Sequence, residues 1–292
     1  MSLNVEVAIV NAFVDGEAGG NPAGIVLAAE RFSAEQKQGI AAAVGLSETA
    51  FVSPSKIADV KLEFFTPVRQ IPHCGHATIA TFAYLRQLGN IRAARSSKET
   101  IDGTREIVLE DDKAFMEQTE PRYADLSPED RGALPAILGL DEGDLFPDIP
   151  AQAVNTGVGF LVVPVRDAAT VKRAKPDQKA VEALSERLDL VGLYLFSRET
   201  RIEGRDAGAR MFAPRFGIPE ESATGMAAGP LACFLHDRMK ANKDQLVIEQ
   251  GHLMEPPSPS AITVRLFRKD GRIRKLMAGG RARRMETRTV EI

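Results

Sequence analysis

The spacing of apolar and polar residues along this chain predicts a mixture of strands and helices. Short apolar runs indicate strands, and apolar residues three to four positions apart indicate helices. In the first half, strands are predicted at 5–13, 24–28, 46–52 and 60–65, with one helix between Ser33 and Gly45 and another ending at Leu88. From there to about 118, further strand signals alternate with polar turns. In the second half, helices are predicted from Pro128, at 177–188 and up to about 239, and strands at 159–165, 193–197, 208–213, 245–249, 261–268 and 272–278.

Several helix ends carry residues that are typical of caps. Ser33 is expected to be an N-cap, with Gln36 completing a capping box. Gly45 fits the stop of the same helix, because glycine readily takes the left-handed conformation found there. Ser127 precedes Pro128, which suits the first helical position because its missing N–H is not needed. The order of elements is not the regular strand–helix alternation of a doubly wound sheet.

One sequence phrase occurs twice, half a chain apart. The first copy spans residues 65–85 and the second spans 212–235. The copies align at an offset of 147 and then, after three extra residues, at 150. The aligned pairs are Phe65 and Phe212, Pro67 and Pro214, Ile71 and Ile218, Pro72 and Pro219, Gly75 and Gly225, Ala77 and Ala227, and Leu85 and Leu235. The duplication predicts two similar lobes, 1–118 completed by about 280–292, and 119–279, with a site between them.

The repeated phrase ends in a loop-to-helix turn that is suited to binding an anion. Backbone N–H groups at a helix N-terminus lack helical partners and carry partial positive charge. Gly75 and Gly225 have no side chain, so a ligand can approach this backbone closely. We therefore expect a small anionic substrate, with a carboxylate as the natural group. Two helix caps that only pack against their surroundings are the alternative.

The side chains of the two turns differ. Cys74 aligns with Thr224, and His76 aligns with Met226. A symmetric two-thiol racemase needs a thiol on each side of its substrate, and only the first turn has one. Cys233 lies nine residues into its predicted helix, so we expect it to be part of the core. A racemase that pairs Cys74 with some other base remains open.

Two carboxylates are candidates for proton transfer. Glu48 lies in the apolar phrase LSETAFV, where burial is expected to raise its pKa and suit it to general acid/base work. Glu221 follows Glu220 just before the second turn. One interpretation is a second acid/base or a hydrogen-bond acceptor for the substrate. The other is simple complementarity to the helix dipole, worth about 0.3–1 kcal/mol.

Composition and charge exclude several other classes of function. The 292 residues carry a net charge of −3 and no Trp, and both facts disfavour nucleic-acid binding. The basic stretch from Arg265 to Arg284 fits strands whose outer face is charged. No apolar run is long enough to span a membrane, and no signal peptide is evident, so a cytoplasmic protein is expected. His73, Cys74 and His76 are too few ligands for a zinc site, and no nucleotide-binding loop occurs, so no metal or cofactor is expected.

Several blocks of the sequence resemble the PhzF-like family of phenazine biosynthesis. They are GNPAGIVL (20–27), LSETAFV (46–52), FFTPVRQIPHCGHATIA (64–80), FAPRFGIPEESATGMAAGPLA (212–232) and the late GG (279–280). The resemblance implies an α+β fold like that of diaminopimelate epimerase, with two pseudo-symmetric lobes, each an antiparallel barrel-like sheet around a central helix. It also implies a homodimer without cofactor or metal.

The resemblance further implies roles for single residues. The family's best-characterised activity is the isomerisation of trans-2,3-dihydro-3-hydroxyanthranilate, in which a Glu that matches Glu48 moves a proton between substrate carbons and a family His matches His76. Three positions depart from the family pattern: Glu221 stands for Asp, Met226 for Ser and Gln70 for Glu. A longer acidic arm and a lost hydroxyl change the geometry around a substrate, and a shift of about 1 Å is enough to slow a reaction. A different substrate is therefore expected.

These observations together predict a cofactor-independent isomerase or epimerase of a small carboxylate-bearing substrate. Glu48, His76 and Glu221 form the expected catalytic set. The expected substrate-binding residues are Cys74, Gly75, Thr224, Gly225 and Met226. The alternative is an inactive homologue of the same fold that binds a ligand or another protein.

Overall fold

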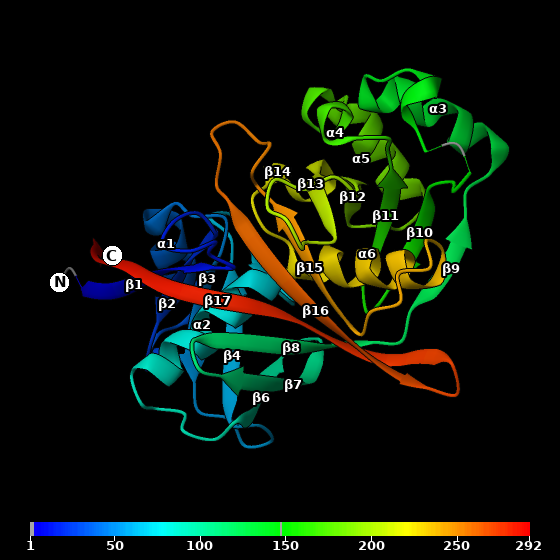
Figure 1. The fold of residues 1–292 in the computed structure, drawn as a ribbon. Helices are drawn as coiled ribbons and strands as arrows, with labels where there is room; N and C mark the ends of the chain where they lie inside the picture. The colour runs from blue at the N-terminus through cyan, green and yellow to red at the C-terminus, as the bar shows by residue number, and fades with distance from the viewer. Residues whose placement is uncertain (1–2, 147) are drawn as a thin grey trace. The chain divides into compact units, whose positions relative to one another are not determined.

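The computed structural model describes residues 3–146 and 148–292 and divides them into two compact units (Figure 1). Unit 1 comprises residues up to Glu117 together with Gly279–Ile292, and unit 2 comprises Gln118–Ala278. The division predicted from the duplication, after 118 and after 279, falls within one residue of this one. Among the described residues, no helix combines the length and the apolar character that crossing a bilayer requires.

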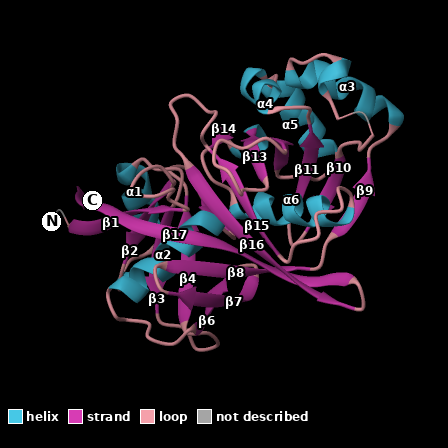
Figure 2. Cartoon of the chain, in the orientation of Figure 1, coloured by secondary structure: helices cyan, strands magenta, loops and turns pink. Residues whose placement is uncertain are grey.

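Unit 1 is built from a ring of strands around one helix (Figures 1 and 2). Its helices are α1 (Ala34–Val44) and α2 (Gly75–Gln87), with a 3₁₀ turn, η1, at Ala29–Arg31. Its strands are β1 (Asn4–Ala12), β2 (Asn21–Val26), β3 (Thr49–Ser53), β4 (Val60–Phe65), β5 (Gln70–Ile71), β6 (Arg95–Thr100), β7 (Gly103–Glu110), β8 (Lys113–Thr119) and most of β17 (Arg272–Glu291). Eight of these described strands close in the order β1, β2, β3, β4, β6, β7, β8, β17.

The second unit repeats much of this connectivity. Its strands are β9 (Arg122–Asp125), β10 (Gln152–Asn155), β11 (Gly159–Pro164), β12 (Gly192–Ser197), β13 (Ala207–Ala213), β14 (Ile218–Glu221), β15 (Gln245–Gln250) and β16 (Ser260–Lys269). Its helices are α3 (Pro128–Leu138), α4 (Ala168–Arg173), α5 (Gln178–Arg187) and α6 (Gly225–Asp237), with 3₁₀ turns η2 (Glu142–Asp144) and η3 (Pro214–Phe216).

The pairings of the two units correspond step by step. An antiparallel hairpin comes first (β1–β2, β10–β11), followed by a parallel pair across a helical crossover (β2–β3, β11–β12). Two antiparallel pairs follow (β3–β4 and β4–β5, β12–β13 and β13–β14). The repeated helix then leads to a second parallel pair (β4–β6, β13–β15). The two pseudo-symmetric lobes of an epimerase-like α+β fold are confirmed, and each sheet is mixed rather than purely antiparallel.

The repeated helices, α2 and α6, are the central ones. Every residue from His76 to Leu85 is buried, and so is every residue from Ala227 to Leu235. A helix that is apolar and buried on all sides belongs inside a core rather than on a surface. Each therefore presents only its ends to ligands, and the repeated turn forms the N-terminal end of each.

The predicted caps agree with the structure. Ser33 and Gln36 form both halves of the capping box of α1, and Gly45 ends the helix with φ of 69°. Ser127 accepts a hydrogen bond from the N–H of Asp130, with Pro128 at the first helical position. Helix α4 and the short strands β5, β9, β10 and β14 have no counterpart among the predicted elements. The predicted strand at 272–278 is the first part of β17, which continues into unit 1.

The basic stretch near the C-terminus forms strand surfaces. Arg281 contacts Asp112, and Arg283 contacts Glu17, both within unit 1. Within unit 2, Arg274 lies 3.3 Å from Glu120. These ion pairs fit the predicted charged outer face of the strands.

A tight backbone contact at Gly279 provides a test of the ring in unit 1. A Cβ atom there would lie 2.1 Å from the Ala114 carbonyl oxygen and 2.6 Å from Phe115 Cα. Backbone atoms of a neighbouring strand cannot move aside cheaply, so Gly279→Ala should lower the free energy of unfolding by about 1–3 kcal/mol. Chemical denaturation measures this loss.

Gly39→Ala is the matched control. Gly39 lies within α1, and its Cβ would have only Ile292 Cγ2 nearby, at 3.8 Å. Because glycine is unfavourable inside a helix, this change should stabilise the protein by about 0.5–1 kcal/mol. Equal effects of the two substitutions would contradict the strand contact at Gly279.

Candidate active site

The first candidate turn lies in unit 1, where the chain enters α2. Cys74 is the N-cap residue, with extended backbone, and makes no side-chain capping hydrogen bond. Its carbonyl oxygen instead accepts a hydrogen bond from the Thr78 hydroxyl at 2.6 Å. The first N–H groups of the helix, from Gly75 onward, have no helical acceptor. The turn thus has the backbone polarity expected of an anion site.

His76 lies between a thiol and a carboxylate. Its Nδ1 is 3.5 Å from Cys74 Sγ, and its Nε2 is 3.3 Å from Glu48 Oε2. All three side chains are buried, with 4–7% of each residue exposed. The structure therefore brings together three of the predicted site residues, which lie up to 28 positions apart in the sequence.

Glu48 is held just before a strand rather than within one. The predicted strand at 46–52 begins only at Thr49, and the Glu48 carbonyl accepts a hydrogen bond from the Gly24 N–H at 3.1 Å. This bond adds Glu48 to the parallel β2–β3 pairing. The backbone next to a sheet is stiff, so the carboxylate keeps its position beside the imidazole. A carboxylate and an imidazole in contact can share or move a proton.

Cys74 is in an environment that keeps its thiol protonated. Burial raises the pKa of Cys74, and the nearby Glu48 raises it further, although His76 acts in the opposite direction. A thiolate is the nucleophilic and basic form of cysteine. Burial also raises the pKa of Cys233, which lies inside α6 with none of its surface exposed. Neither cysteine of the chain is thus placed as an activated thiol.

The Glu48, Cys74 and His76 cluster also offers donor atoms that a metal ion accepts. One donor atom from each residue lies within 4.8 Å of the other two. The imidazole, however, turns one nitrogen toward the thiol and the other toward the carboxylate. A single zinc ion bonds to only one of those nitrogens, and its ligand distances are about 2.0–2.3 Å. The arrangement fits a chain of proton-linked groups better than a metal centre.

The second candidate turn lies in unit 2, where β14 leads into α6. Thr224 is the N-cap residue, and its hydroxyl contacts the Glu221 carboxylate. Gly225 is the first helical residue, and Met226, the counterpart of His76, is half-buried. Thr224, Gly225 and Met226 follow one another at the start of α6, and the Glu221 side chain is linked to them by its contact with Thr224.

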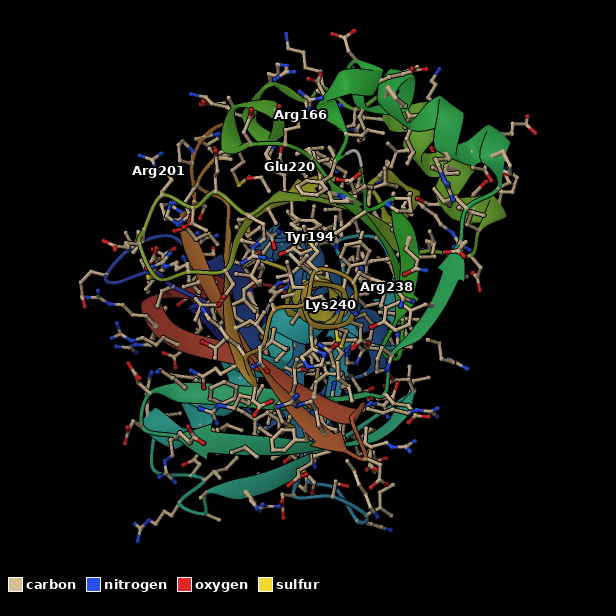
Figure 3. The ribbon with its side chains drawn as sticks, turned by 45° about the vertical axis from the view of Figure 1, so that its right-hand side comes forward. Arg166, Tyr194, Arg201, Glu220, Arg238 and Lys240 are labelled. Atoms are coloured by element: carbon tan, nitrogen blue, oxygen red, sulfur yellow. The ribbon has the colours of Figure 1, made fainter. Side chains whose placement is uncertain are left out.

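Gln250 organises this second turn, and sequence reasoning missed it. Its Oε1 accepts hydrogen bonds from the Thr224 N–H at 3.0 Å and from the Tyr194 hydroxyl at 2.8 Å. Its Nε2 donates to the Glu221 carbonyl at 2.7 Å and to Thr224 Oγ1 at 3.1 Å. Tyr194 is fully buried, and burial raises its pKa, so its hydroxyl remains a donor (Figure 3). The only feature of the sequence that could have indicated this role is a glutamine at the end of a mainly apolar strand.

The two adjacent glutamates have different surroundings. Glu220 forms a bidentate ion pair with Arg210, at 2.8 Å and 2.7 Å. Arg210 in turn donates to the carbonyl of Val171 at 3.0 Å, which ties β13 to α4. Glu220 is therefore a structural residue, labelled in Figure 3. The Glu221 carboxylate instead contacts the Thr224 hydroxyl at the turn.

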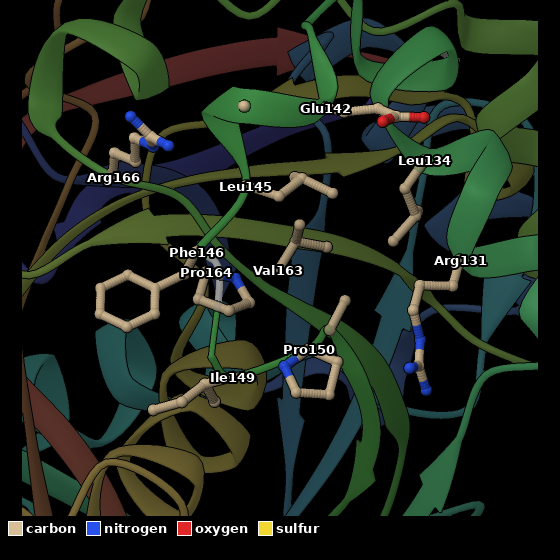
Figure 4. A pocket seen from close by; sticks show the side chains of 12 residues that line it. Arg131, Leu134, Glu142, Leu145, Phe146, Ile149, Pro150, Val163, Pro164 and Arg166 are labelled. Atoms are coloured by element: carbon tan, nitrogen blue, oxygen red, sulfur yellow. The ribbon is translucent and has the colours of Figure 1, made fainter.

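Unit 2 also contains a cavity of about 490 Å³ (Figure 4). Its walls are mainly apolar, and Arg131, Glu142 and Arg166 add charge. The predicted site residues are not among those that line it. Its size is within the usual range for small-molecule pockets, but it brings no acid/base pair together. The candidate chemistry therefore belongs to the turns.

The sequence matches the family model described as phenazine biosynthesis-like protein over residues 10–288. The chain belongs to this family. It is 33% identical over 257 residues to the uncharacterized isomerase YddE of Escherichia coli, covering 85% of this chain and 84% of that protein. It is 32% identical over 257 residues to the trans-2,3-dihydro-3-hydroxyanthranilate isomerase of Pseudomonas aeruginosa, covering 86% and 87%. The expected family and the isomerase class are confirmed.

Solved structures agree on the fold. A PhzF-family protein of Bacillus anthracis superposes with a TM-score of 0.90 at 27% identity, covering 99% of this chain and all of that one. A hydroxyproline epimerase of Agrobacterium vitis superposes with a TM-score of 0.61 at 14% identity, covering 99% and 91%. The second likeness shows the epimerase fold alone.

The Gln250 network in unit 2 can be tested by removing its amide. Gln250→Leu leaves the Thr224 N–H, the Tyr194 hydroxyl and the Glu221 carbonyl without their partner. Buried polar groups left in this way cost about 1–3 kcal/mol each, so a loss of about 2–4 kcal/mol in the free energy of unfolding is expected. Chemical denaturation measures it. Gln245→Leu, an exposed position of the same strand, should change stability by less than about 0.5 kcal/mol. A loss no larger than the control's would refute the network.

Proposed function

We propose that this protein is a cofactor-independent isomerase that moves a proton between carbon atoms of a small carboxylate-bearing substrate. The observation that carries the proposal is the contact between Glu48 and His76, buried at the start of α2. A single buried carboxylate beside an imidazole suits transfer of a proton away from bulk water. The isomerase named for the Pseudomonas relative supports a reaction of this type.

In the proposed reaction, Glu48 acts first as a base and then as an acid. The carboxylate takes a proton from a substrate C–H bond, and the electron pair of that bond moves into the substrate's own unsaturated system. The protonated Glu48 then returns a proton to a different carbon, which regenerates the carboxylate. His76 holds the carboxylate in position, and the N–H groups at the start of α2 bind the substrate's anionic group.

The residues of the second turn have predicted roles in the same reaction. Glu221 is proposed as a hydrogen-bond acceptor for a polar group of the substrate, held by Thr224. Met226 is proposed to make the substrate differ from trans-2,3-dihydro-3-hydroxyanthranilate, because a thioether supplies no hydroxyl to bind that molecule's polar groups. A homodimer stays a prediction.

Deuterium exchange tests the role of Glu48 even while the substrate is unidentified. A metabolite extract is incubated with the protein in D₂O, and mass spectrometry identifies compounds that gain one deuterium. We expect wild-type protein to label at least one small carboxylate, and Glu48→Gln to slow that labelling by about 10²-fold or more, because acid/base groups contribute 10²–10⁴-fold. trans-2,3-Dihydro-3-hydroxyanthranilate serves as a defined probe.

Two control variants sharpen the result. Glu30→Gln removes an exposed carboxylate of the same unit and should label at the wild-type rate. Cys74→Ala should keep most of the activity, whereas a thiol-dependent racemase would lose it. Full labelling by a folded Glu48→Gln variant would exclude Glu48 as the base. Absence of labelling by wild-type protein, together with a ligand that co-purifies, would support an inactive binding protein instead.

A further inference from the structure

Lys98 in unit 1 is a fully buried lysine that the proposed reaction does not use. It lies on β6, and none of its surface is exposed. Its Nζ donates to Thr78 Oγ1 at 3.1 Å, lies 3.0 Å from His73 Nδ1, and stands 5.4 Å from the centre of the Phe64 ring. Lysine is almost never fully buried unless it is paired. Such a costly placement calls for an explanation.

Some of the groups around Lys98 are charged, and they come from several parts of unit 1. Asp102, in the turn after β6, lies 3.4 Å from His73 Nδ1 and 3.6 Å from Arg105. Burial lowers the pKa of Lys98 to about 7, although the charge of Asp102 raises it and that of Arg105 lowers it. Burial, and then the charge of Lys98, lower the pKa of His73. A lysine with a pKa of about 7 gains or loses its proton near neutral pH.

Lys98 is connected to the candidate turn by two hydrogen bonds in series. Its amine donates to the Thr78 hydroxyl, and that hydroxyl donates to the Cys74 carbonyl at 2.6 Å. This carbonyl belongs to the same peptide bond as the N–H of Gly75. The chain of hydrogen bonds therefore ends on the same peptide group that carries the proposed anion-binding N–H of Gly75.

We propose that Lys98 is a positioning residue of the active site, which acts through Thr78 to hold the Cys74–Gly75 peptide in place and makes that hold depend on its own proton. A charged amine donates hydrogen bonds roughly twice as strong as those of a neutral one, and bonds in series strengthen one another. The peptide is therefore held most firmly when Lys98 is protonated. The consequence for catalysis rests on the proposed function, but the coupling itself does not.

The amide signal of Gly75 reports this coupling directly. In ¹H–¹⁵N NMR spectra of the whole protein without ligand, the Gly75 amide shift should change with pH with a midpoint of about 7. Lys98→Met, which keeps the length of the side chain and removes its charge, should abolish that transition. Thr78→Val should abolish it as well, while the Lys98 Nζ signal still titrates.

Matched controls exist for both variants. Thr81 is also buried in α2, and its hydroxyl donates to the carbonyl four residues earlier, that of Ala77, at 2.7 Å. Thr81→Val should therefore leave the Gly75 transition unchanged. Lys113→Met, at an exposed position of β8, should leave it unchanged too. A Gly75 transition that survives in Thr78→Val, or in folded Lys98→Met, would overturn the proposal, because the transition would then not come from Lys98 through Thr78.

A second measurement confirms where the proton is lost. Between pH 7 and 10.5 the unfolded chain keeps a proton on this lysine that the folded protein has released, so wild-type protein gains stability as pH rises through that range. Lys98→Met should lack this gain. If Lys98 remains charged in the folded protein up to pH 10, the two stability profiles run parallel and the proposal fails.

Measurements of activity connect the coupling to function, and a negative result there can be told apart from a negative result in the NMR experiment. If the exchange reaction is found, its kcat should fall as pH rises through about 7 in wild-type protein and in Thr81→Val, but not in Thr78→Val. Loss of the NMR coupling refutes the role of Lys98 and leaves Glu48 untouched. Exchange activity absent in every variant refutes the proposed function, while the Gly75 transition still stands.

Discussion

The burial of a whole helix inside a closed ring of strands is the constraint on which unit 1 depends. Helix α2 has no face in contact with water between His76 and Leu85. Every polar side chain on it must therefore find a partner inside the protein, because an unpaired buried polar group is costly. Thr78 and Thr81 meet this need through carbonyls of their own helix, and Thr78 also receives Lys98. Only the helix ends remain for chemistry.

The two copies of the repeated turn share their backbone arrangement but differ in what their side chains do. Both copies start a buried helix with a glycine, but their side chains serve different ends. In unit 1, Cys74, His76 and Glu48 form a chain of proton-linked groups. In unit 2, Gln250 uses its whole amide to fix the turn that carries Glu221 and Thr224. The two copies thus share a backbone arrangement, while one carries the proposed acid/base groups and the other a hydrogen-bond network around Gln250.

Local features of the fold are predictable from sequence, and long-range ones are not. The caps at Ser33 and Ser127 depend on residues within three positions, so the sequence contains all that they need. The parallel pairs and the continuity of β17 depend on contacts across the chain. Lys98 lies in the polar phrase RSSKET, which is typical of an exposed strand. Its burial follows from the placement of Phe64, His73 and Thr78 around it, and no neighbour in the sequence indicates that.

The candidate site shows the same division. Glu48, Cys74 and His76 are predictable because each stands in a distinctive phrase, and the structure places them in contact. Gln250 and Tyr194 stand in ordinary apolar strands, so their joint role is set by tertiary structure. Glu220 and Glu221 are adjacent in the sequence, and only the position of Arg210 shows that Glu220 is the one held in an ion pair within the fold.

Strand β17 has a consequence for the order in which the protein can fold during synthesis. Unit 2 consists of one continuous stretch, Gln118–Ala278, which leaves the ribosome complete. Unit 1 begins first but finishes last, since its ring closes only when residues after 279 reach β1 and β8. Until then both of those strands present open edges, which readily pair with other chains. The newly made N-terminal half therefore exposes two unpaired strand edges for the time that unit 2 takes to emerge.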